Sequence, residues 1–298
     1  MNGFLNILKP PGMTSAAVVA MVRRATGEKR VGHAGTLDPE ASGVLPVMIG
    51  KAARLFDYLV DKEKEYVAEA AFGQATDTQD ATGHVIAEGE AYPDLAQVRE
   101  AAQTLVGDIW QRPSMYSAIK KDGTPMYERA RRGEEIEVPL RQVHVESSDV
   151  HEEMPNHGFR MTIRCGRGTY IRSICNDLGE KLGCPAHMRF LLRSMSGAFD
   201  LSTAMTLEEM QAHAQAGTLQ QNLIALDAPL AHIPRVDEPT RYSKQVINGA
   251  KIPLKSVEIE EYIPVRVYLK DAFWGMAVRE GDMLVWRAQI APEEEVQA

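Results

Sequence analysis

A strict alternation of apolar and polar residues, followed at once by a helical pattern, is the feature that most narrows the folds open to this chain. From Phe159 to Cys165 every second residue is apolar, and two arginines and a threonine lie between them. This alternation predicts a β-strand with one buried face, because successive side chains of a strand point to opposite faces. Gly166-Arg-Gly168 then turns the chain into a predicted helix over 171–182, whose apolar residues share one stripe.

Strand and helix patterns follow one another elsewhere without a regular rhythm. Two further strands are predicted at 4–8 and 66–72. Capping residues mark three more helix starts, at Thr14 or Ser15, Asp94 and Thr206. Because no regular βαβ repeat is present, we expect an α+β fold with a mainly antiparallel mixed sheet that is flanked by helices and loops.

The C-terminal part of the chain contains strand patterns alone. Three short strands are predicted there, at 263–269, 273–278 and 283–288. Arg235–Pro239 is interpreted as the linker that precedes them. We therefore expect a large domain at 1–234, followed by a small β domain with an acidic tail at 235–298.

Composition and missing motifs exclude several classes of protein. With 44% apolar and 25% charged residues, the chain has the composition of a folded globular protein. No apolar stretch reaches the ~18 residues of a membrane span and no secretory signal pattern begins the sequence, so we expect no membrane attachment. Three cysteines do not make a disulfide framework, which favours a reducing cytoplasm. No nucleotide-binding loop or metal-ligand motif occurs, so we expect neither a nucleotide cofactor nor a metal.

Charge is unevenly spread along a chain whose net charge is -8. Residues 1–54 and 158–200 each carry seven Lys and Arg against three Asp and Glu, whereas residues 61–108 carry three against eleven. A basic surface on an acidic protein suits a phosphate-rich partner, because the local potential governs docking. We expect the two basic segments to surround one cleft and the acidic segment to lie mostly opposite. An even scatter of solvated charge is the alternative.

The densest segment, Arg30–Pro46, combines glycines and prolines with one histidine and one aspartate. Glycine lets a ligand approach the backbone closely. Asp38 precedes Pro39, and this order disfavours helical backbone and presents the carboxylate on a rigid loop. Such a carboxylate suits a nucleophile or a base. An ordinary Asx-Pro turn explains the same composition and stays the alternative.

The run Gly32-His-Ala-Gly-Thr-Leu-Asp38-Pro39, with Gly43-Val-Leu45 after it, resembles the catalytic signature of the TruB-type tRNA pseudouridine synthases. The resemblance covers roughly residues 4–210, and an ordered set of motifs is far more specific than any one of them. The other motifs in the order of that family are Lys9-Pro-Pro-Gly12, Lys64-Glu-Tyr66, Asp77-Thr-Gln-Asp80, Tyr116-Ser-Ala-Ile-Lys120, Tyr127 with Ala130-Arg131, Gly168-Thr-Tyr-Ile-Arg172 and Asp177-Leu-Gly179.

The resemblance implies a fold, a reaction and a partner. The fold is that of the pseudouridine synthases, with a small PUA-like RNA-binding β domain at the C-terminus. The family flips uridine 55 out of the T loop of tRNA, breaks its N1–C1′ bond, rotates the base and rejoins it through C5, without metal or cofactor. We therefore expect an isomerase that binds the T arm of tRNA. A monomer is expected because the sequence contains no coiled-coil heptad or large unexplained apolar stripe, and a cytoplasmic location is expected from the cysteine content. A catalytically idle RNA-folding module and an RNA N-glycosidase are the competing functions.

The resemblance also assigns the catalytic residues. Asp38 is the implied essential carboxylate, and its two possible roles, nucleophile or base on the ribose, both stay open. Arg172 is implied to pair with it through a forked guanidinium contact. Without the resemblance, the local pattern fits an ordinary solvated arginine on a helix. Tyr66 is implied to stack on the flipped uracil or to exchange a proton near it, whereas a core tyrosine is the ordinary interpretation.

The remaining implied residues support the base or hold the RNA. His33 resembles the wedge that fills the space left by the flipped base. Tyr170 is implied to pack beneath the catalytic pair and Leu191 to form an apolar wall. An insertion at about 112–144 resembles the RNA-gripping thumb of the family, although a charged loop whose acids cancel its bases explains the same residues. The expected RNA contacts are Lys9, Lys120, Lys121, Arg129, Arg131 and Arg132.

Overall fold

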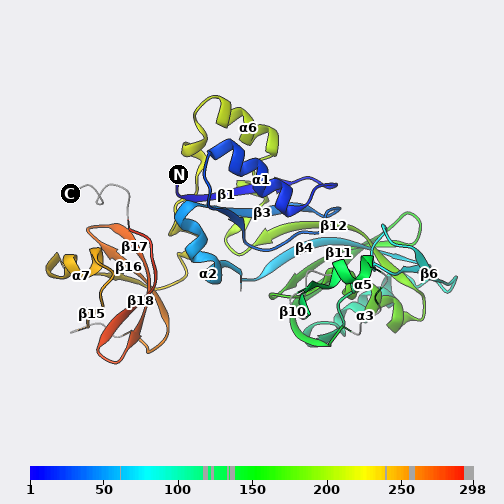
Figure 1. Ribbon diagram of the computed structural model, residues 1–298. Coiled ribbons are helices and arrows are strands. Elements are labelled where there is room, and N and C mark those ends of the chain that lie inside the picture. The colour runs from blue at the N-terminus through cyan, green and yellow to red at the C-terminus, as the bar shows by residue number, and fades with distance from the viewer. Residues whose placement is uncertain are drawn as a thin grey trace.

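The computed structural model shows a large body built on a nine-stranded sheet and a smaller C-terminal body built on a five-stranded sheet (Figure 1). Among the residues that it describes, no helix is long and apolar enough to cross a membrane. The structure describes residues 1–60, 62–116, 120–121, 124–132, 134, 138–238, 240–254 and 259–291.

The large sheet runs in the order β1-β3-β12-β4-β11-β10-β7. Its neighbouring strands are antiparallel except β3 and β12, which pair in parallel at two positions. The predicted mixed, mainly antiparallel sheet is therefore confirmed. The strands are β1 (Gly3–Lys9), β3 (Ser42–Ile49), β12 (Ala186–Ser196), β4 (Lys64–Phe72), β11 (Gly158–Cys165), β10 (Arg141–Met154) and β7 (Gly107–Gln111), with β2 (Val31–His33) beside β3 and β13 (Phe199–Asp200) beside β12.

The parallel contact divides the sheet into two halves with separate cores. Helices α1 (Ser15–Thr26) and α6 (Leu207–Gln215) pack on β1 and β3 through one apolar cluster. Helices α3 (Leu95–Gln103) and α5 (Ile171–Leu182) share another cluster with β4, β10, β11 and β12. The loop between β2 and β3 lies beside the junction of these halves, and it carries Asp38.

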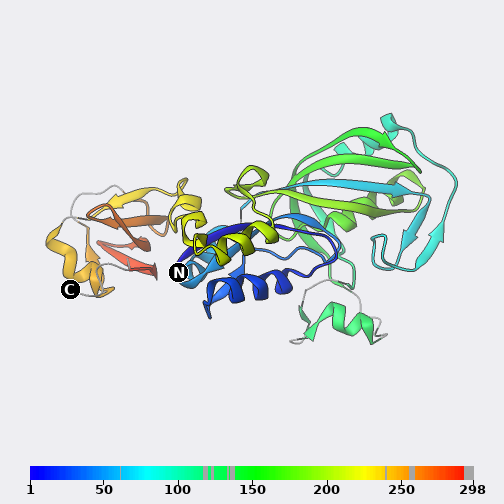
Figure 2. The ribbon, with the colours of Figure 1, turned by 90° about the horizontal axis from the view of Figure 1, so that it is seen from above.

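Short elements complete the large body. Figure 2 shows α4 projecting away from the main sheet at the tip of the insertion. The short elements are η1 (Gly50–Leu55), α2 (Phe56–Val60), β5 (Gln74–Thr76), β6 (Val85–Glu88), β8 (Lys120–Lys121), β9 (Thr124–Pro125), α4 (Met126–Arg131), η2 (Leu201–Thr203), η3 (Leu219–Asn222) and η4 (Ala228–Leu230).

Local hydrogen bonds explain where the longer helices begin. Thr14, rather than Ser15, caps α1 by accepting a hydrogen bond from the backbone N–H of Ala17. Asp94 and Thr206 each form a complete capping box, so the predicted starts of α3 and α6 are confirmed. These bonds satisfy backbone donors that have no partner within the helix.

The C-terminal sheet has the order β14-β16-β17-β18-β15. Its strands are β14 (Arg235–Asp237), β16 (Pro264–Leu269), β17 (Ala272–Glu280), β18 (Met283–Gln289) and β15 (Ile252–Pro253), with η5 (Thr240–Tyr242) and α7 (Ser243–Ile247) between β14 and β15. The three predicted strands are confirmed. The predicted linker is wrong for Arg235–Asp237, because these residues pair in parallel with β16 as an edge strand.

The two bodies are joined by packing as well as by the chain. Met276, Ala288 and Ile290 of the smaller body lie in one apolar cluster with Leu55 and Leu59 of the larger body. The side chains of Lys51 and Arg54 also donate hydrogen bonds to backbone carbonyls of the C-terminal sheet and of the residues after it. Burial of this cluster favours a fixed orientation of the two bodies.

Candidate active site

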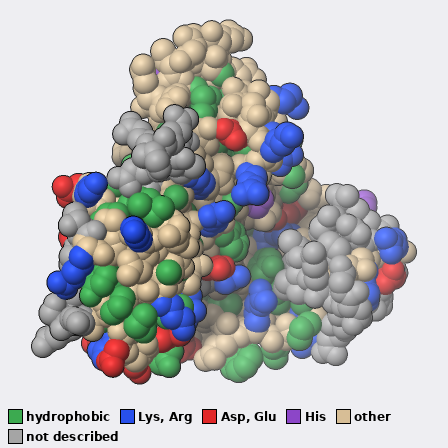
Figure 3. Space-filling model, turned by 60° about the vertical axis from the view of Figure 1, so that its left-hand side comes forward, with side chains coloured by type: hydrophobic (Ala, Val, Ile, Leu, Met, Phe, Trp, Pro, Cys, Tyr) green, Lys and Arg blue, Asp and Glu red, His purple; other side chains and the backbone are tan. Residues whose placement is uncertain are grey.

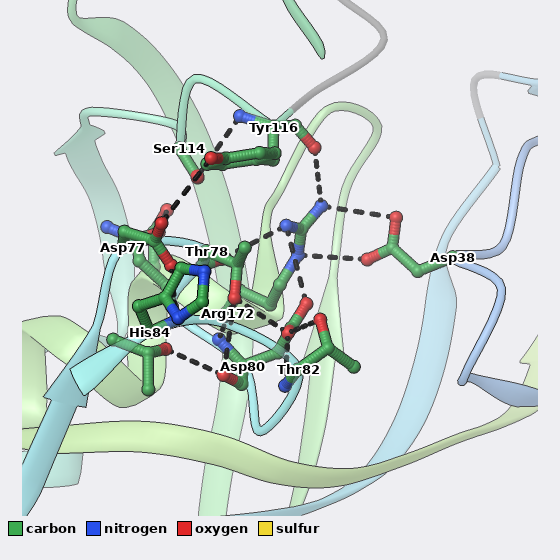
Figure 4. A network of polar contacts seen from close by, with 12 residues as sticks. Asp38, Asp77, Thr78, Asp80, Thr82, His84, Ser114, Tyr116 and Arg172 are labelled. Carbon is green, nitrogen blue, oxygen red and sulfur yellow. Dashed lines mark hydrogen bonds and ion pairs between the residues drawn. The ribbon is translucent and has the colours of Figure 1, made fainter. Parts of the chain in front are cut away.

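Asp38 and Arg172 face each other across the junction of the two sheet halves (Figure 4). Nε of Arg172 lies 2.9 Å from Oδ2 of Asp38, and Nη2 donates to Oδ1 at 3.1 Å. The guanidinium therefore grips both carboxylate oxygens in a fork. The side chain of Arg172 is 6% exposed and that of Asp38 is 36% exposed. The carboxylate is thus held from the protein side and open on the other.

The guanidinium of Arg172 also joins two further segments to this pair (Figure 4). It donates to the carbonyl oxygens of Thr78 and Tyr116, each at 3.1 Å. Its Nη1 lies 3.6 Å from Oδ2 of Asp80. One buried cation thereby connects the Asp38 loop, the turn at 77–83 and the base of the insertion.

Asp80 organises the turn that meets Arg172. Its Oδ1 accepts hydrogen bonds from the hydroxyls of Thr78 and Thr82 and from the backbone N–H of Thr82. Asp77 accepts a bond from the backbone N–H of His84 in the same turn. Both aspartates belong to the acidic segment expected mostly opposite the cleft. For these two residues that expectation is wrong, because the buried guanidinium attracts the turn to the site.

The loop that carries Asp38 is fixed on both sides. The Ser15 hydroxyl accepts from the backbone N–H of Leu37 at 2.9 Å and lies 3.0 Å from its carbonyl oxygen. The ammonium of Lys9 donates to the carbonyl oxygens of Pro10 and Pro39, each at 2.8 Å. These contacts surround Asp38 in the chain and limit its backbone movement.

The expectation that Lys9 contacts RNA is wrong. Its side chain is fully buried, and burial lowers the pKa of Lys9 to about 8, although the charges of Glu40 and Asp38 oppose that change. A phosphate on the surface cannot reach an ammonium in this position. The lysine instead has a structural role at the Asp38 loop.

The ionisation of Asp38 reflects opposing influences. Burial is the largest and raises the pKa of Asp38, and the charge of Asp80 adds to that rise. The charges of Arg172 and Lys9 and the hydrogen bond from Arg172 lower it, without cancelling the rise. The folded protein therefore holds a carboxylate that takes up a proton more readily than an ordinary aspartate does.

Tyr66 and Leu191 belong to the same apolar cluster as Leu37 and Ala41 of the Asp38 loop. Tyr66 lies on β4 and is buried, and burial raises the pKa of its phenol. The structure therefore brings Tyr66, Leu191, Asp38 and Arg172 to one region. A neutral phenol there can exchange hydrogen bonds with a base and supply an aromatic face.

Tyr170 and His33 flank this region. Tyr170 precedes α5, and its backbone N–H and carbonyl both bond the buried side chain of Gln111. His33 ends β2, where burial and the charge of Arg193 lower its pKa, so the imidazole is neutral near pH 7. Its Nδ1 is buried and has no hydrogen-bond partner within the described part of the chain.

The expected RNA contacts of the insertion are only partly described. Arg129 lies on α4 and is half-buried. Arg132 is the first residue after this helix and is exposed, and both arginines make polar contacts. The side chains of Lys120, Lys121 and Arg131 lie outside the described residues. Figure 3 shows Lys and Arg side chains along the hollow in the middle of one face. That face suits a polyanion, because local potential steers a charged partner.

A cavity of about 1060 Å³ is present away from Asp38. It lies between the base of the insertion and α5, where Asp77, Asp177 and Glu180 contribute carboxylates. Arg112 and Lys181 also line the cavity, but carboxylates outnumber these two cations among its described lining residues. Carboxylates repel phosphate groups, so the cavity suits an RNA strand poorly. The open face of Asp38 is the better position for a substrate.

Ser15, Asp80 and Arg193 also belong to the site, and no role was predicted for them from sequence. Arg193 had a recognisable signal, since it lies two residues after Leu191 and so on the same face of a strand. Ser15 was expected only as a possible helix cap, and Asp80 only as part of a motif. Their partners are far away in the chain, which leaves no local pattern to detect.

Two family models together match residues 23–231. The model described as "TruB family pseudouridylate synthase (N terminal domain)" matches residues 23–171. The model described as "tRNA pseudouridylate synthase B C-terminal domain" matches residues 172–231. The boundary between them falls inside α5, so the contact of Asp38 with Arg172 joins the two matched regions.

Similar proteins cover most of the chain. A "tRNA pseudouridine synthase B" of Alkaliphilus oremlandii is 43% identical over 285 residues, which is 93% of each protein. Another of that name, from Bacillus subtilis, is 41% identical over 84% of this chain and 83% of its own. The solved structure described as "Crystal Structure of a Cbf5-Nop10-Gar1 Complex" aligns with a TM-score of 0.75 at 25% identity, over 98% of this chain and 86% of the other.

Proposed function

Because this chain belongs to the TruB family of pseudouridylate synthases, we propose that it converts uridine 55 in the T loop of tRNA to pseudouridine, with Asp38 as the essential carboxylate. It has the pseudouridine synthase fold and is an isomerase. Its relatives are named for tRNA, which supports tRNA as the substrate. The forked contact between Arg172 and Asp38 is the observation that carries the proposal for the site.

The geometry supports a division of labour among the site residues. Arg172 fixes the orientation of both Asp38 oxygens, so the open face of the carboxylate is aimed before the ribose arrives. Tyr66 and Leu191 offer an aromatic ring and an apolar wall to a flipped uracil, which offsets part of the unstacking cost. Asp38 then acts as a nucleophile or as a base on the ribose, and both roles fit this orientation.

The division of the chain into domains is part of the same proposal. We place the catalytic domain at 1–234, with the RNA-gripping insertion at about 112–144, and an RNA-binding PUA-like domain at 235–298. The start of β14 at Arg235 supports the boundary. His33 as the wedge and Tyr170 as support beneath the pair complete the proposed site. The monomeric state, the cytoplasmic location and the lack of a cofactor stay predictions.

Incubation of the protein with unmodified tRNA tests the function directly. We expect pseudouridine at position 55 in at least one equivalent relative to the enzyme. Because the isomerisation leaves the mass unchanged, the product is labelled with a carbodiimide that reacts stably with pseudouridine, and the labelled tRNA is analysed by nuclease digestion and mass spectrometry. Free uracil in the reaction would indicate an N-glycosidase instead. Bound but unchanged tRNA would indicate an RNA-folding module, and either result overturns the proposal.

The pH dependence of the reaction follows from Asp38. Since burial raises the pKa of Asp38, the acid limb of the single-turnover rate is expected at a higher pH than an ordinary aspartate, whose pKa is about 3.9, would give. The rate is full above that pKa and falls as the pH drops through it. Stability changes in the opposite sense, because folding favours the protonated form and its contribution is lost as the pH rises. A rate that is unchanged down to about pH 4 would contradict this assignment.

RNA binding is expected to weaken as salt rises. The logarithm of the affinity should fall against the logarithm of salt concentration by about 0.7 per phosphate contact if the bound strand behaves as single-stranded. A T-arm hairpin should compete with tRNA far better than an unstructured RNA of equal length, because phosphate spacing and the exposed base must both match. Equal competition, or binding that is indifferent to salt, would argue against a basic cleft.

A further inference from the structure

Arg193 is a fully buried guanidinium at the centre of the large sheet. Its Nε donates to the carbonyl oxygen of Val44 at 2.8 Å. Nη2 donates to the carbonyl oxygen of Gly35 at 3.1 Å, and Nη1 donates to that of Thr36 at 3.4 Å. One side chain of β12 therefore holds both β3 and the loop that leads to Asp38.

The backbone of Arg193 lies between β3 and β4. Gly43 has a φ of +114°, and a Cβ there would overlap the backbone of Arg193, so the two strands approach closely only because residue 43 is glycine. On the other side, Arg193 is the cross-strand partner of Tyr66. Side chains directly opposite in an antiparallel pair lie on one face of the sheet. Arg193 is thus a neighbour of both the Asp38 loop and the Tyr66 ring.

The charge of Arg193 has no carboxylate partner within an ion-pair distance among the described residues. A buried guanidinium without such a partner is costly, and carbonyl oxygens offset only part of the cost. The buried charged side chains of the described structure are Lys9, Lys64, Arg172, Arg193 and Glu238. Three of these cations, Lys9, Arg172 and Arg193, contact either Asp38 or the segments that adjoin it in the chain.

We propose that Arg193 is a positioning residue of this reaction, which holds the Gly35 and Thr36 carbonyls, and thereby the Asp38 loop, and places its positive charge beside Tyr66. This inference rests on the proposed function. It assigns Arg193 an action through Asp38 and Tyr66, and no contact of its own with the ribose.

Electrostatics at Tyr66 are consistent with that role. Burial raises the pKa of Tyr66, and Cys165 and Asp38 act in the same direction. The charge of Arg193 acts in the opposite direction. Arg193 therefore polarises a phenol that its surroundings otherwise keep neutral. It also lowers the pKa values of Lys9 and His33, which lie near the same loop.

The test compares Arg193→Gln and Arg193→Lys with Arg189→Gln in the full chain. Arg189 lies on the same strand, is half-buried and contacts Glu69 and the carbonyl of Pro155, so it controls for the loss of a strand arginine. We expect the single-turnover rate with saturating tRNA to fall by about 100-fold in Arg193→Gln, while the dissociation constant for tRNA stays within about twofold. Arg193→Lys keeps the charge but cannot bond the three carbonyl groups in the same geometry. Its rate should therefore lie between that of Arg193→Gln and that of the unaltered protein.

Two readouts separate positioning from general destabilisation. Amide hydrogen exchange should accelerate in residues 34–41 of Arg193→Gln at conditions where α1 and α5 exchange as in the unaltered protein. The Tyr66 ring resonance, in protein with ¹³C-labelled tyrosine and assigned with Tyr66→Phe, should titrate at a higher pH than in the unaltered protein. Neither change is expected in Arg189→Gln.

These measurements keep the inference apart from the proposed function. If the unaltered protein leaves tRNA unmodified, the proposed function fails, and exchange and titration still decide whether Arg193 positions the loop and acts on the phenol. Normal exchange at 34–41 with a normal Tyr66 titration in Arg193→Gln would overturn the inference. If Arg193→Gln does not fold, the same readouts in Arg193→Lys decide it, because loss of the three-carbonyl geometry alone should loosen the loop.

Discussion

Replacement of Asp38 by Asn is expected to abolish pseudouridine formation, with a loss of at least about four orders of magnitude in single-turnover rate. The amide keeps the size of the carboxylate and can still accept a hydrogen bond from Arg172, so the loop should keep its position. It carries no charge and cannot act as nucleophile or base. RNA binding should survive, because the change removes a negative charge from a surface that meets phosphates.

Asp94→Asn is the matched control for this variant. Asp94 is exposed at the start of α3, and asparagine caps a helix as well as aspartate does. This control should therefore retain the full rate and a normal unfolding transition. Product formed by Asp38→Asn at more than about one per cent of the normal rate would remove Asp38 from the chemistry.

Arg172→Ala should cost both activity and stability. The variant leaves the Asp38 carboxylate without its fork and removes the donors that bond the carbonyl groups of Thr78 and Tyr116. We expect a loss on the order of 2–3 kcal/mol in the free energy of unfolding, below the usual value for a buried pair because Asp38 is 36% exposed. The pKa of Asp38 should rise further, which moves the acid limb of the rate to higher pH.

Arg172→Lys distinguishes charge from geometry. An ammonium restores the positive charge but cannot place two parallel donors on one carboxylate, so we expect the rate to stay at least about 100-fold low. Arg24→Lys, at an exposed position of α1, serves as the control and should be unaffected. A near-normal rate for Arg172→Lys would show that the forked geometry is not needed.

Much of the fold was predictable because its signals are local. The alternation from Phe159 to Cys165 is observed as β11, which begins one residue earlier, at Gly158. The apolar stripe that follows it is observed as α5, which begins and ends at the predicted residues. Periodicities of two and 3.6 residues arise within one element and need no knowledge of its neighbours. The small C-terminal strands were found for the same reason. The edge strand β14 was missed because three residues carry too little pattern.

The environment of each charged site residue was not predictable in this way. Lys9 was expected at a phosphate and is buried beneath the Asp38 loop. Asp80 belongs to the acidic segment that was expected mostly opposite the cleft, and it lies beside Arg172. Each lysine, arginine or aspartate has the same local pattern whether it faces water or the interior. Its burial depends on which distant segment covers it.

The sequence by itself determined the helices and strands, their caps and the ordered motifs that identify Asp38. The tertiary structure alone decided that Asp38 meets Arg172, which lies 134 positions away. It also decided that Arg193 anchors both β3 and the loop that leads to Asp38. Capping and alternation are set by residues a few positions apart, whose geometry the backbone fixes. A buried charge persists only where remote carbonyls and carboxylates compensate its lost hydration, and those partners meet only when the two halves of the sheet have joined.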